Sequence, residues 1–343
     1  MRKMLNSLYV TTQGAYLFKD GETVAVKING EVRLRIPVHT LSSLVCFGNV
    51  SCSPFLLAHC AGNGVTVSFL SEHGRFLARV QGEVSGNVLL RREQYRRADD
   101  GSASADIARS FLIGKISNSI HIIKRYLRDH AAKIDKAAME NGVARLGQHL
   151  RSLKTSANLD QLRGIEGIAA NNYFEVFDHF ILTNKQDFHF SGRNRRPPLD
   201  AVNCLLSFVY TLLYHDARSA LESVGLDPAV GYLHRDRPGR MGLALDLMEE
   251  LRPVFADRLV LSLINLDQVR KSSFTRTETG AVLMDDETRK LVLQEYQKRK
   301  QVEINHPFLQ EKIPVGMILF SQAKLLSRFL RGDLDGYPPF IWR

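Results

Sequence analysis

Short apolar runs alternate with turn sequences along the first ninety residues of the chain. The runs are rich in β-branched and aromatic residues; they read LYVTT, AYLFK, TVAVKI and EVRLRIP, with KDGE and INGE between them. Asp-Gly and Asn-Gly pairs between such runs are strong hairpin signals. The pattern predicts a small sheet or sandwich, together with one short helix that begins at Pro54 and ends near Gly62.

Beyond Asp106 the apolar residues recur at helical spacing. The clearest examples are ADIARSFLIGKISNSIHIIKRYLRDHA, NLDQLRGIEGIAANNYFEVFDHFIL and DAVNCLLSFVYTLLYHDARSALES. The stretch before them, LLRREQYRRADDGSASAD, is charged and then small and polar, which indicates a linker. We therefore predict an α+β fold, with a β-sandwich-like N-terminal domain (residues 1–90), a linker (91–105) and a larger all-α domain (106–343).

The charge balance changes this picture by pointing to an anionic partner. The 343 residues include 46 Lys and Arg against 36 Asp and Glu, a formal net charge of +10. Nucleic acid is the first candidate for the partner, and an anionic membrane surface is the second. No basic amphipathic anchor, secretory apolar region or run of roughly 20 apolar residues stands out, so we expect a cytoplasmic protein without a membrane partner.

Three acidic residues follow a basic loop in the stretch GYLHRDRPGRMGLALDLMEELRP, which runs from Gly231 to Pro253. The apolar residues of the predicted helix form one stripe, and Asp246, Glu249 and Glu250 lie off it. A solvated helix face explains these acids without any chemistry. The alternative is a metal site to which some of them contribute ligands.

Glu166 is placed differently, because it shares a helix face with apolar residues (Leu162, Ala169, Ala170 and Tyr173). A carboxylate in such a stripe must be paired, protonated or bound to a cation. Gly164 and Gly167 flank it and suggest that another backbone passes close by. Two interpretations stay open: an ion pair with an arginine such as Arg163, and a metal ligand.

A histidine and a cluster of arginines are the remaining candidates for a functional site. His234 lies in the loop GYLHRDRPGR, and a neutral imidazole with carboxylates suits Mn²⁺ or Mg²⁺ chemistry on phosphates better than zinc chemistry. Arg193, Arg195 and Arg196 cluster in FHFSGRNRRPPLD, and the arginine fork fits phosphate oxygens. A merely solvated basic loop is the alternative for the arginines.

Several of these segments, in this order and at these separations, resemble one known family. They are RGIEGIAANNYFEVF, RNRRPPLDAVNCLLSFVYTLL and VGLDPAVGYLHRDRPGRMGLALDLMEELRPVFADRLVLSLIN, and GVTVSFLSEHGRFLARV fits in the β-rich part. Together they resemble the CRISPR-associated integrase, the nuclease-like subunit of the CRISPR adaptation module. HRDRPGRMGLALDLMEELRP looks most like the subtype I-C branch.

The resemblance implies an N-terminal β domain that mediates dimerisation and a helical catalytic domain. It implies a homodimer that flanks a small ferredoxin-like companion protein, holds a DNA duplex and joins its 3′ ends into a repeat array by metal-dependent transesterification. The family's metal ligands fall on Glu166, His234 and Glu249, and a second important acid falls on Asp246. Many members carry Asp where this chain has Glu249, so Asp246 and Glu250 stay as alternative ligands.

The sequence thus predicts a metal-dependent DNA endonuclease and integrase of CRISPR spacer acquisition that uses Mg²⁺ or Mn²⁺. The predicted catalytic residues are Glu166, His234, Asp246 and Glu249, and the predicted DNA contacts are Arg193, Arg195, Arg196 and Tyr173. The main alternative is a non-catalytic helical DNA-binding scaffold protein whose acids are only solvated. A third reading is an unrelated metal phosphoesterase that acts on small substrates.

Overall fold

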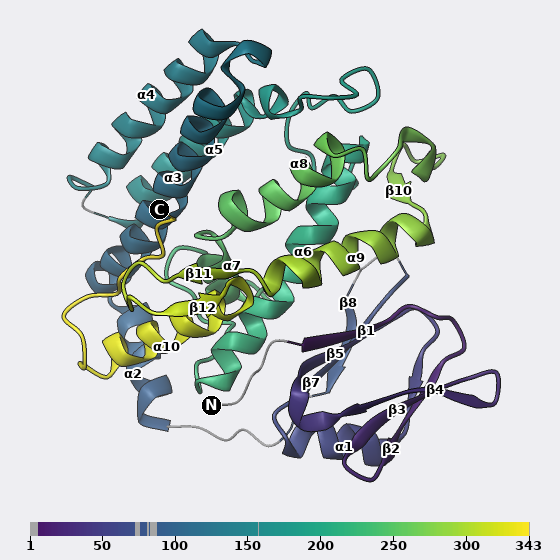
Figure 1. The fold of residues 1–343 in the computed structure, drawn as a ribbon. Coiled ribbons are helices and arrows are strands. Elements are labelled where there is room, and N and C mark those ends of the chain that lie inside the picture. The colour runs from purple at the N-terminus through teal and green to yellow at the C-terminus, as the bar shows by residue number, and fades with distance from the viewer. Residues whose placement is uncertain (1–5, 73–75, 81, 83–87, 157, 343) are drawn as a thin grey trace. The chain divides into compact units, whose positions relative to one another are not determined.

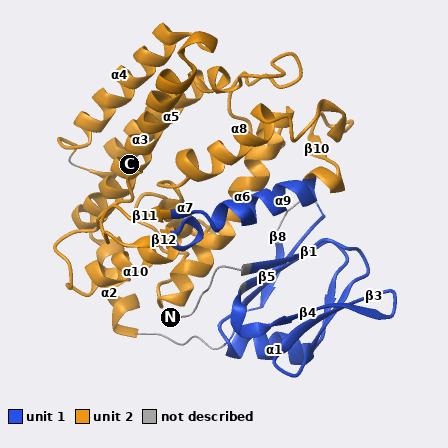
Figure 2. Cartoon of the chain, viewed as in Figure 1, with its two compact units in different colours: residues 1–86, 289–303, 314–317 blue, residues 87–288, 304–313, 318–343 orange. Residues whose placement is uncertain are grey.

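The computed structural model describes residues 6–72, 76–80, 82, 88–156 and 158–342 of the chain. It divides into two compact units, shown in blue and orange in Figure 2. Unit 1 comprises residues 1–86, 289–303 and 314–317, and unit 2 comprises residues 87–288, 304–313 and 318–343. The expected α+β character is confirmed, with a small N-terminal sheet region and a larger helical part.

Unit 1 holds two four-stranded sheets, with strand orders β1-β5-β7-β8 and β4-β3-β2-β6 (Figure 1). Both predicted hairpins are present, and Asn29 and Gly30 form one turn with φ of +49° and +88°. Parallel pairs, β1 with β5 and β5 with β7, were not predicted. The strands are β1 (Asn6–Val10), β2 (Tyr16–Asp20), β3 (Thr23–Ile28), β4 (Glu31–Pro37), β5 (Leu41–Phe47), β6 (Ser51–Cys52), β7 (Thr66–Leu70) and β8 (Phe76–Val80).

One apolar core is shared by the two sheets of unit 1. Leu17 and Val24 of one sheet and Leu44 and Val67 of the other belong to the same buried cluster. The predicted short helix, α1 (Pro54–Gly62), adds Leu56 and Cys60 to this core, and the Ser53 side chain caps its first turn. Helix α9 (Asp286–Lys300) returns to unit 1, where the Gln297 amide donates to the Ser7 carbonyl.

Unit 2 is built mainly of helices. They are α2 (Val88–Asp99), α3 (Gly101–His130), α4 (Lys136–Ser152), α5 (Leu159–Glu175), α6 (Ala201–Ser223), α7 (Gly242–Met248), the π-helix η4 (Arg252–Asp257), α8 (Arg258–Asn265) and α10 (Ile318–Leu330). Helix α3 packs against α4, α5 and η4, and α6 packs against α7 and α10. This packing brings α3, α5 and the α7–η4 segment together.

Short elements complete the chain. They are the 3₁₀ helices η1 (Val38–Thr40), η2 (Ala131–Lys133), η3 (Phe177–Phe180), η5 (Lys271–Ser273) and η6 (Val315–Met317), and the strands β9 (Phe274–Arg276), β10 (Val282–Met284), β11 (Glu303–Asn305) and β12 (Lys312–Pro314).

The predicted linker over residues 91–105 is wrong, because these residues lie in α2 and the first turn of α3. Asp100 ends one helix and caps the next, since its side chain accepts from the backbone N–H groups of Ser102 and Ala103. The small residues that follow favour caps and helices as readily as loops. Among the described helices, none combines the length and the apolar content that a membrane span requires.

Candidate functional site

The loop that carries His234 lies directly on the start of α7. A Cβ atom at Gly231 would lie 2.6 Å from the Gly242 carbonyl carbon and 2.9 Å from an Asp246 carboxylate oxygen. Only hydrogen fits at this approach, so the pair of glycines lets the loop backbone reach the Asp246 side chain. This contact fixes where His234 can lie.

Asp246 binds the loop with both carboxylate oxygens. Oδ2 accepts from the N–H groups of Tyr232 (2.6 Å) and Leu233 (3.0 Å), and Oδ1 accepts from the N–H of His234 (3.1 Å). His234 Nδ1 lies 2.5 Å from the same Oδ1. Asp246 is fully buried, and these four contacts occupy its acceptor positions. Its geometry is that of a positioning residue that leaves His234 Nε2 directed toward Glu249, whose Oε1 lies 4.0 Å away.

Glu249 follows α7 and is 1 % exposed. Its Oε1 lies 2.6 Å from Arg252 Nη1, and its Oε2 lies 2.7 Å from Lys115 Nζ of α3. Burial raises the pKa of Glu249, but the positive charges of Arg252, Lys115 and His234 outweigh burial and bring the pKa to about 2. Glu249 is therefore an anion held in the interior by two cations.

Glu166 comes to the same place from α5, whose first turn is capped by the Asn158 side chain. Lys115 Nζ lies 2.5 Å from Glu166 Oε1, so one ammonium contacts both Glu166 and Glu249. The Glu166 side chain is 29 % exposed, which makes it the most accessible of the predicted ligands.

Two expectations about the surroundings of Glu166 are wrong. Arg163 pairs with Asp160 and donates to the Leu233 carbonyl, so the partner of Glu166 is a lysine of another helix. Among the described residues, no other element approaches Gly164 or Gly167, since a Cβ at either position would meet nothing within 4 Å. Close approaches do occur at Gly231 and Gly242, and at Gly114 against Glu250.

Glu250 is also buried, so the interpretation of Asp246, Glu249 and Glu250 as a solvated face is wrong. Glu250 accepts hydrogen bonds from the Tyr337 hydroxyl (2.7 Å), the Phe340 N–H (2.8 Å) and the Gln322 amide (3.0 Å). Burial raises the pKa of Glu250 to about 8, against the lowering effect of these donors. Its partners belong to α10 and the C-terminal segment, and they occupy the oxygens that an alternative metal ligand would need.

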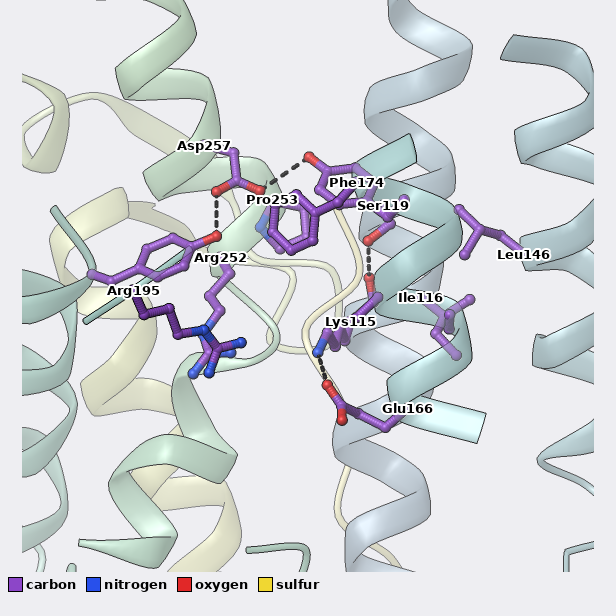
Figure 3. A pocket seen from close by; sticks show the side chains of 14 residues that line it. Lys115, Ile116, Ser119, Leu146, Glu166, Phe174, Arg195, Arg252, Pro253 and Asp257 are labelled. Atoms are coloured by element: carbon purple, nitrogen blue, oxygen red, sulfur yellow. Dashed lines mark hydrogen bonds and ion pairs between the residues drawn. The ribbon is translucent and has the colours of Figure 1, made fainter. Parts of the chain in front are cut away.

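A small cavity of about 30 Å³ lies beside Glu166. Lys115 and Glu166 line one wall of it, and Arg195 and Arg252 line the other (Figure 3). This space exceeds the roughly 10–15 Å³ that one water molecule needs. Deeper in the same pocket, Asp257 accepts from the hydroxyls of Tyr210 (2.6 Å) and Tyr173 (3.0 Å).

The structure does not present Tyr173 as a DNA contact. It is 4 % exposed, its hydroxyl is donated to Asp257, and burial raises its pKa well above the usual tyrosine value. Asp257 is itself fully buried, and burial raises its pKa to about 6, against hydrogen bonds from Tyr210 and Tyr173. Tyr173 therefore supports the wall of the pocket.

The predicted arginine cluster divides into two kinds of side chain. Arg193 donates to Asn203 Oδ1 (2.7 Å) and Ser207 Oγ (3.1 Å), and its guanidinium lies 5.3 Å from the centre of the Tyr210 ring. Burial lowers the pKa of Arg193, which places it among the structural residues of this region. Arg195 and Arg196 are exposed, so they retain the predicted freedom to contact phosphate.

The structure adds three residues that the sequence analysis missed: Lys115, Arg252 and Gln94. Gln94 of α2 is fully buried; its amide donates to the carbonyls of Asp227 and Val230 and accepts from the Asp227 N–H, which holds the loop before His234. Lys115 had a detectable signal, because it lies four residues after Phe111 on an apolar face of its helix. The argument applied to Glu166 would have found it.

Two features of this arrangement suit a divalent cation, although the side chains are not positioned as metal ligands in the structure as described. Within the described residues, no group of three or more His, Cys, Asp or Glu side chains is arranged to hold a metal ion. However, a cationic nitrogen already lies between Glu166 and Glu249. Glu249 Oε2 is buried, and its close partner is the Lys115 ammonium at 2.7 Å, so this oxygen lies where positive charge is already bound.

Comparison with known proteins places this chain in a class. The model of the family described as CRISPR associated protein Cas1 matches residues 8–298. The chain is 56 % identical over 343 residues to "CRISPR-associated endonuclease Cas1 1" of Chlorobaculum tepidum, and 53 % identical over 347 residues to "CRISPR-associated endonuclease Cas1 2" of Rhodospirillum rubrum. Both comparisons cover all of each chain. These matches define a DNA-processing enzyme of CRISPR adaptation, an endonuclease and integrase. The chain belongs to the Cas1 family.

Solved structures share the fold. TM1797, a Cas1 protein from Thermotoga maritima, superposes with a TM-score of 0.83 over 97 % of this chain and 98 % of that one, at 22 % identity. A casposase bound to its integration product superposes with a TM-score of 0.82 over 98 % of this chain and 94 % of that one, also at 22 % identity.

Proposed function

We propose that this chain joins the 3′ ends of short DNA duplexes to a CRISPR repeat array through a divalent-metal site formed by Glu166, His234 and Glu249. The observation that carries the proposal is that His234 Nε2 lies 4.0 Å from Glu249 Oε1, while Glu249 and Glu166 share one ammonium group, that of Lys115. Carboxylate oxygens with one imidazole nitrogen are a donor set for Mg²⁺ or Mn²⁺.

The protein's own groups then have distinct tasks. Asp246 holds His234 through Nδ1 and leaves Nε2 free to bind, as a carboxylate commonly does behind a metal-ligating histidine. Glu249 brings a permanent negative charge into the interior, and Glu166 provides the ligand closest to solvent, where DNA can approach. When bound, the divalent ion lowers the pKa of the attacking 3′-OH and stabilises charge on the phosphate. Arg195 and Arg252 line the adjoining cavity with positive charge for phosphate oxygens.

Removal of divalent metal is expected to abolish joining and cleavage while leaving duplex binding in place. A strand-transfer assay with a labelled duplex and a repeat-containing target, run with EDTA and then with excess Mn²⁺, measures this. His234→Ala should reduce joining by roughly 10²-fold or more at saturating Mn²⁺. Joining that survives EDTA would contradict the proposal. DNA binding without any reaction, at every metal concentration tested, would contradict the proposed metal site as well.

The exposed arginines are expected to hold the duplex. The Arg195→Ala/Arg196→Ala variant should bind DNA more weakly and show a salt dependence, log K against log[salt], that is shallower by up to about 2, because each lost phosphate contact removes about 0.9 from the slope. Fluorescence anisotropy at several salt concentrations measures this slope. The charge-retaining Arg195→Lys/Arg196→Lys variant is the control and should keep the slope. An unchanged slope in the alanine variant would show that both arginines are bystanders.

The partners follow the family. We propose a homodimer formed through the N-terminal β unit, a small ferredoxin-like companion protein, and a cytoplasmic location. Support for a companion comes from a solved structure titled "Cas6-RT-Cas1--Cas2 complex", part of which superposes on this chain with a TM-score of 0.82. The form of the sequence from His234 to Pro253 supports assignment to the subtype I-C branch.

A further inference from the structure

One ammonium group links three separate segments at the centre of the site. Lys115 Nζ of α3 lies 2.5 Å from Glu166 Oε1 of α5 and 2.7 Å from Glu249 Oε2 after α7. The Lys115 side chain is 11 % exposed. The two carboxylates that contact this ammonium offset the cost of burying it.

The contact with Glu249 is of a kind that another cation can replace. Glu249 Oε2 is buried, and its close partner is the Lys115 ammonium, with Nζ 2.7 Å away. The attraction in this ion pair is mainly one of charge, which another cation can also supply. The opposite oxygen, Oε1, keeps Arg252 at 2.6 Å, so Glu249 does not depend on Lys115 alone for a partner.

A divalent cation held by the same two oxygens would have to lie directly against both of them. The ammonium already occupies that space, and the two positive charges would repel each other strongly at such a separation. Metal binding there requires the ammonium to move. The small cavity that Lys115 and Glu166 line gives it room to do so.

We propose that Lys115 is a built-in stand-in for the divalent cation: it holds Glu166 and Glu249 together in the metal-free protein, and metal binding displaces it. This inference rests on the proposed metal site. It has two consequences. The wild-type protein binds metal more weakly than its donor set allows, because binding must expel a charge. In the metal-free protein, the ammonium also offsets the electrostatic repulsion between Glu166 and Glu249.

The decisive variant is Lys115→Met, which keeps the length of the side chain and removes its charge. Titration of the full-length protein with Mn²⁺, followed by calorimetry or by the EPR signal of free Mn²⁺, should show binding roughly tenfold tighter or more than in the wild type. The metal-free variant should also melt at a lower temperature than metal-free wild type, and saturating Mn²⁺ should restore most of the loss. Lys124→Met, an exposed lysine of the same helix, is the matched control and should leave both readouts unchanged.

A purely structural role would give the opposite sign, since a damaged site binds metal more weakly. Unchanged or weaker Mn²⁺ binding by Lys115→Met would therefore overturn the inference. Lys115→Gln, which keeps a polar group, repeats the test if the methionine variant does not fold. Failure of the proposed function looks different: in that case wild-type protein itself would bind no Mn²⁺.

Discussion

Glu249→Gln is expected to lose strand transfer by roughly 10³-fold, the largest activity loss among the acidic residues of this segment. The carboxylate is fully charged at neutral pH, because its pKa is about 2, and it meets Lys115 on one oxygen and Arg252 on the other. A neutral amide is a much poorer ligand for a hard cation. The change also leaves Arg252 without its carboxylate partner and Lys115 with Glu166 alone. Mn²⁺ calorimetry and the strand-transfer assay measure the two effects.

The adjacent residue provides the matched control for this prediction. Glu250→Gln changes the same functional group one position further along, yet its side chain contacts Tyr337, Gln322 and the Phe340 N–H rather than the site. Its Mn²⁺ affinity should stay near that of the wild type. The Mn²⁺ affinity of Asp246→Asn should fall between those of Glu249→Gln and Glu250→Gln, because the change disturbs His234 without removing a ligand. Glu249→Asp should keep part of the strand-transfer activity. Greater damage in Glu250→Gln than in Glu249→Gln would refute the assignment.

Glu250→Ala is expected to cost about 3–5 kcal/mol of unfolding free energy while leaving the ligand side chains in place. Truncation leaves the buried Phe340 N–H without its acceptor, removes the partner of the Tyr337 hydroxyl and opens a cavity against Gly114 of α3. Denaturant unfolding at neutral pH measures the loss, with Glu140→Ala, an exposed glutamate of α4, as the control. A loss below about 1 kcal/mol would show that the segment is held elsewhere.

The same residue should give unfolding a characteristic pH dependence. Burial raises the pKa of Glu250 from 4.5 to about 8, so between these values the unfolded chain releases a proton that the folded chain keeps. Stability from this group is therefore present at low pH and falls by a few kcal/mol as pH rises to about 8. Glu250→Gln cannot titrate, so its stability relative to wild type should increase across this range. A constant difference would contradict the assigned pKa.

The sequence predicted the helices α3, α5 and α6 and the hairpins of unit 1 because their apolar periodicity is strong. It missed α2, whose polar composition resembles a linker and whose key contact, Gln94 with the loop before His234, joins residues far apart in sequence. Ion pairing was one of the interpretations it allowed for Glu166, but it could not choose Lys115, because helix periodicity places a residue on a face without saying which helix packs there.

The interpretation of Asp246, Glu249 and Glu250 as a solvated helix face was wrong for a related reason. A single apolar stripe implies one covered side only if nothing else packs on the helix. Here the loop from Gly231 to His234 covers Asp246, and the C-terminal segment around Tyr337 and Phe340 covers Glu250. Neither contact leaves a periodic trace in the sequence, since both are made by irregular backbone.

The close approach of Gly231 and Gly242 bears on how this protein can drift during evolution. Any side chain at either position would push the histidine loop away from Asp246, and no change at the other glycine could compensate, because it already has no side chain to lose. Residues 235–239 are exposed, although Arg235 pairs with Asp160 and Gly239 has a φ of +73°, which favours glycine. Diversity within lineages should therefore be lowest at Gly231 and Gly242 and higher at exposed positions such as Asp236 and Arg237, where a new side chain leaves the contact with Asp246 in place.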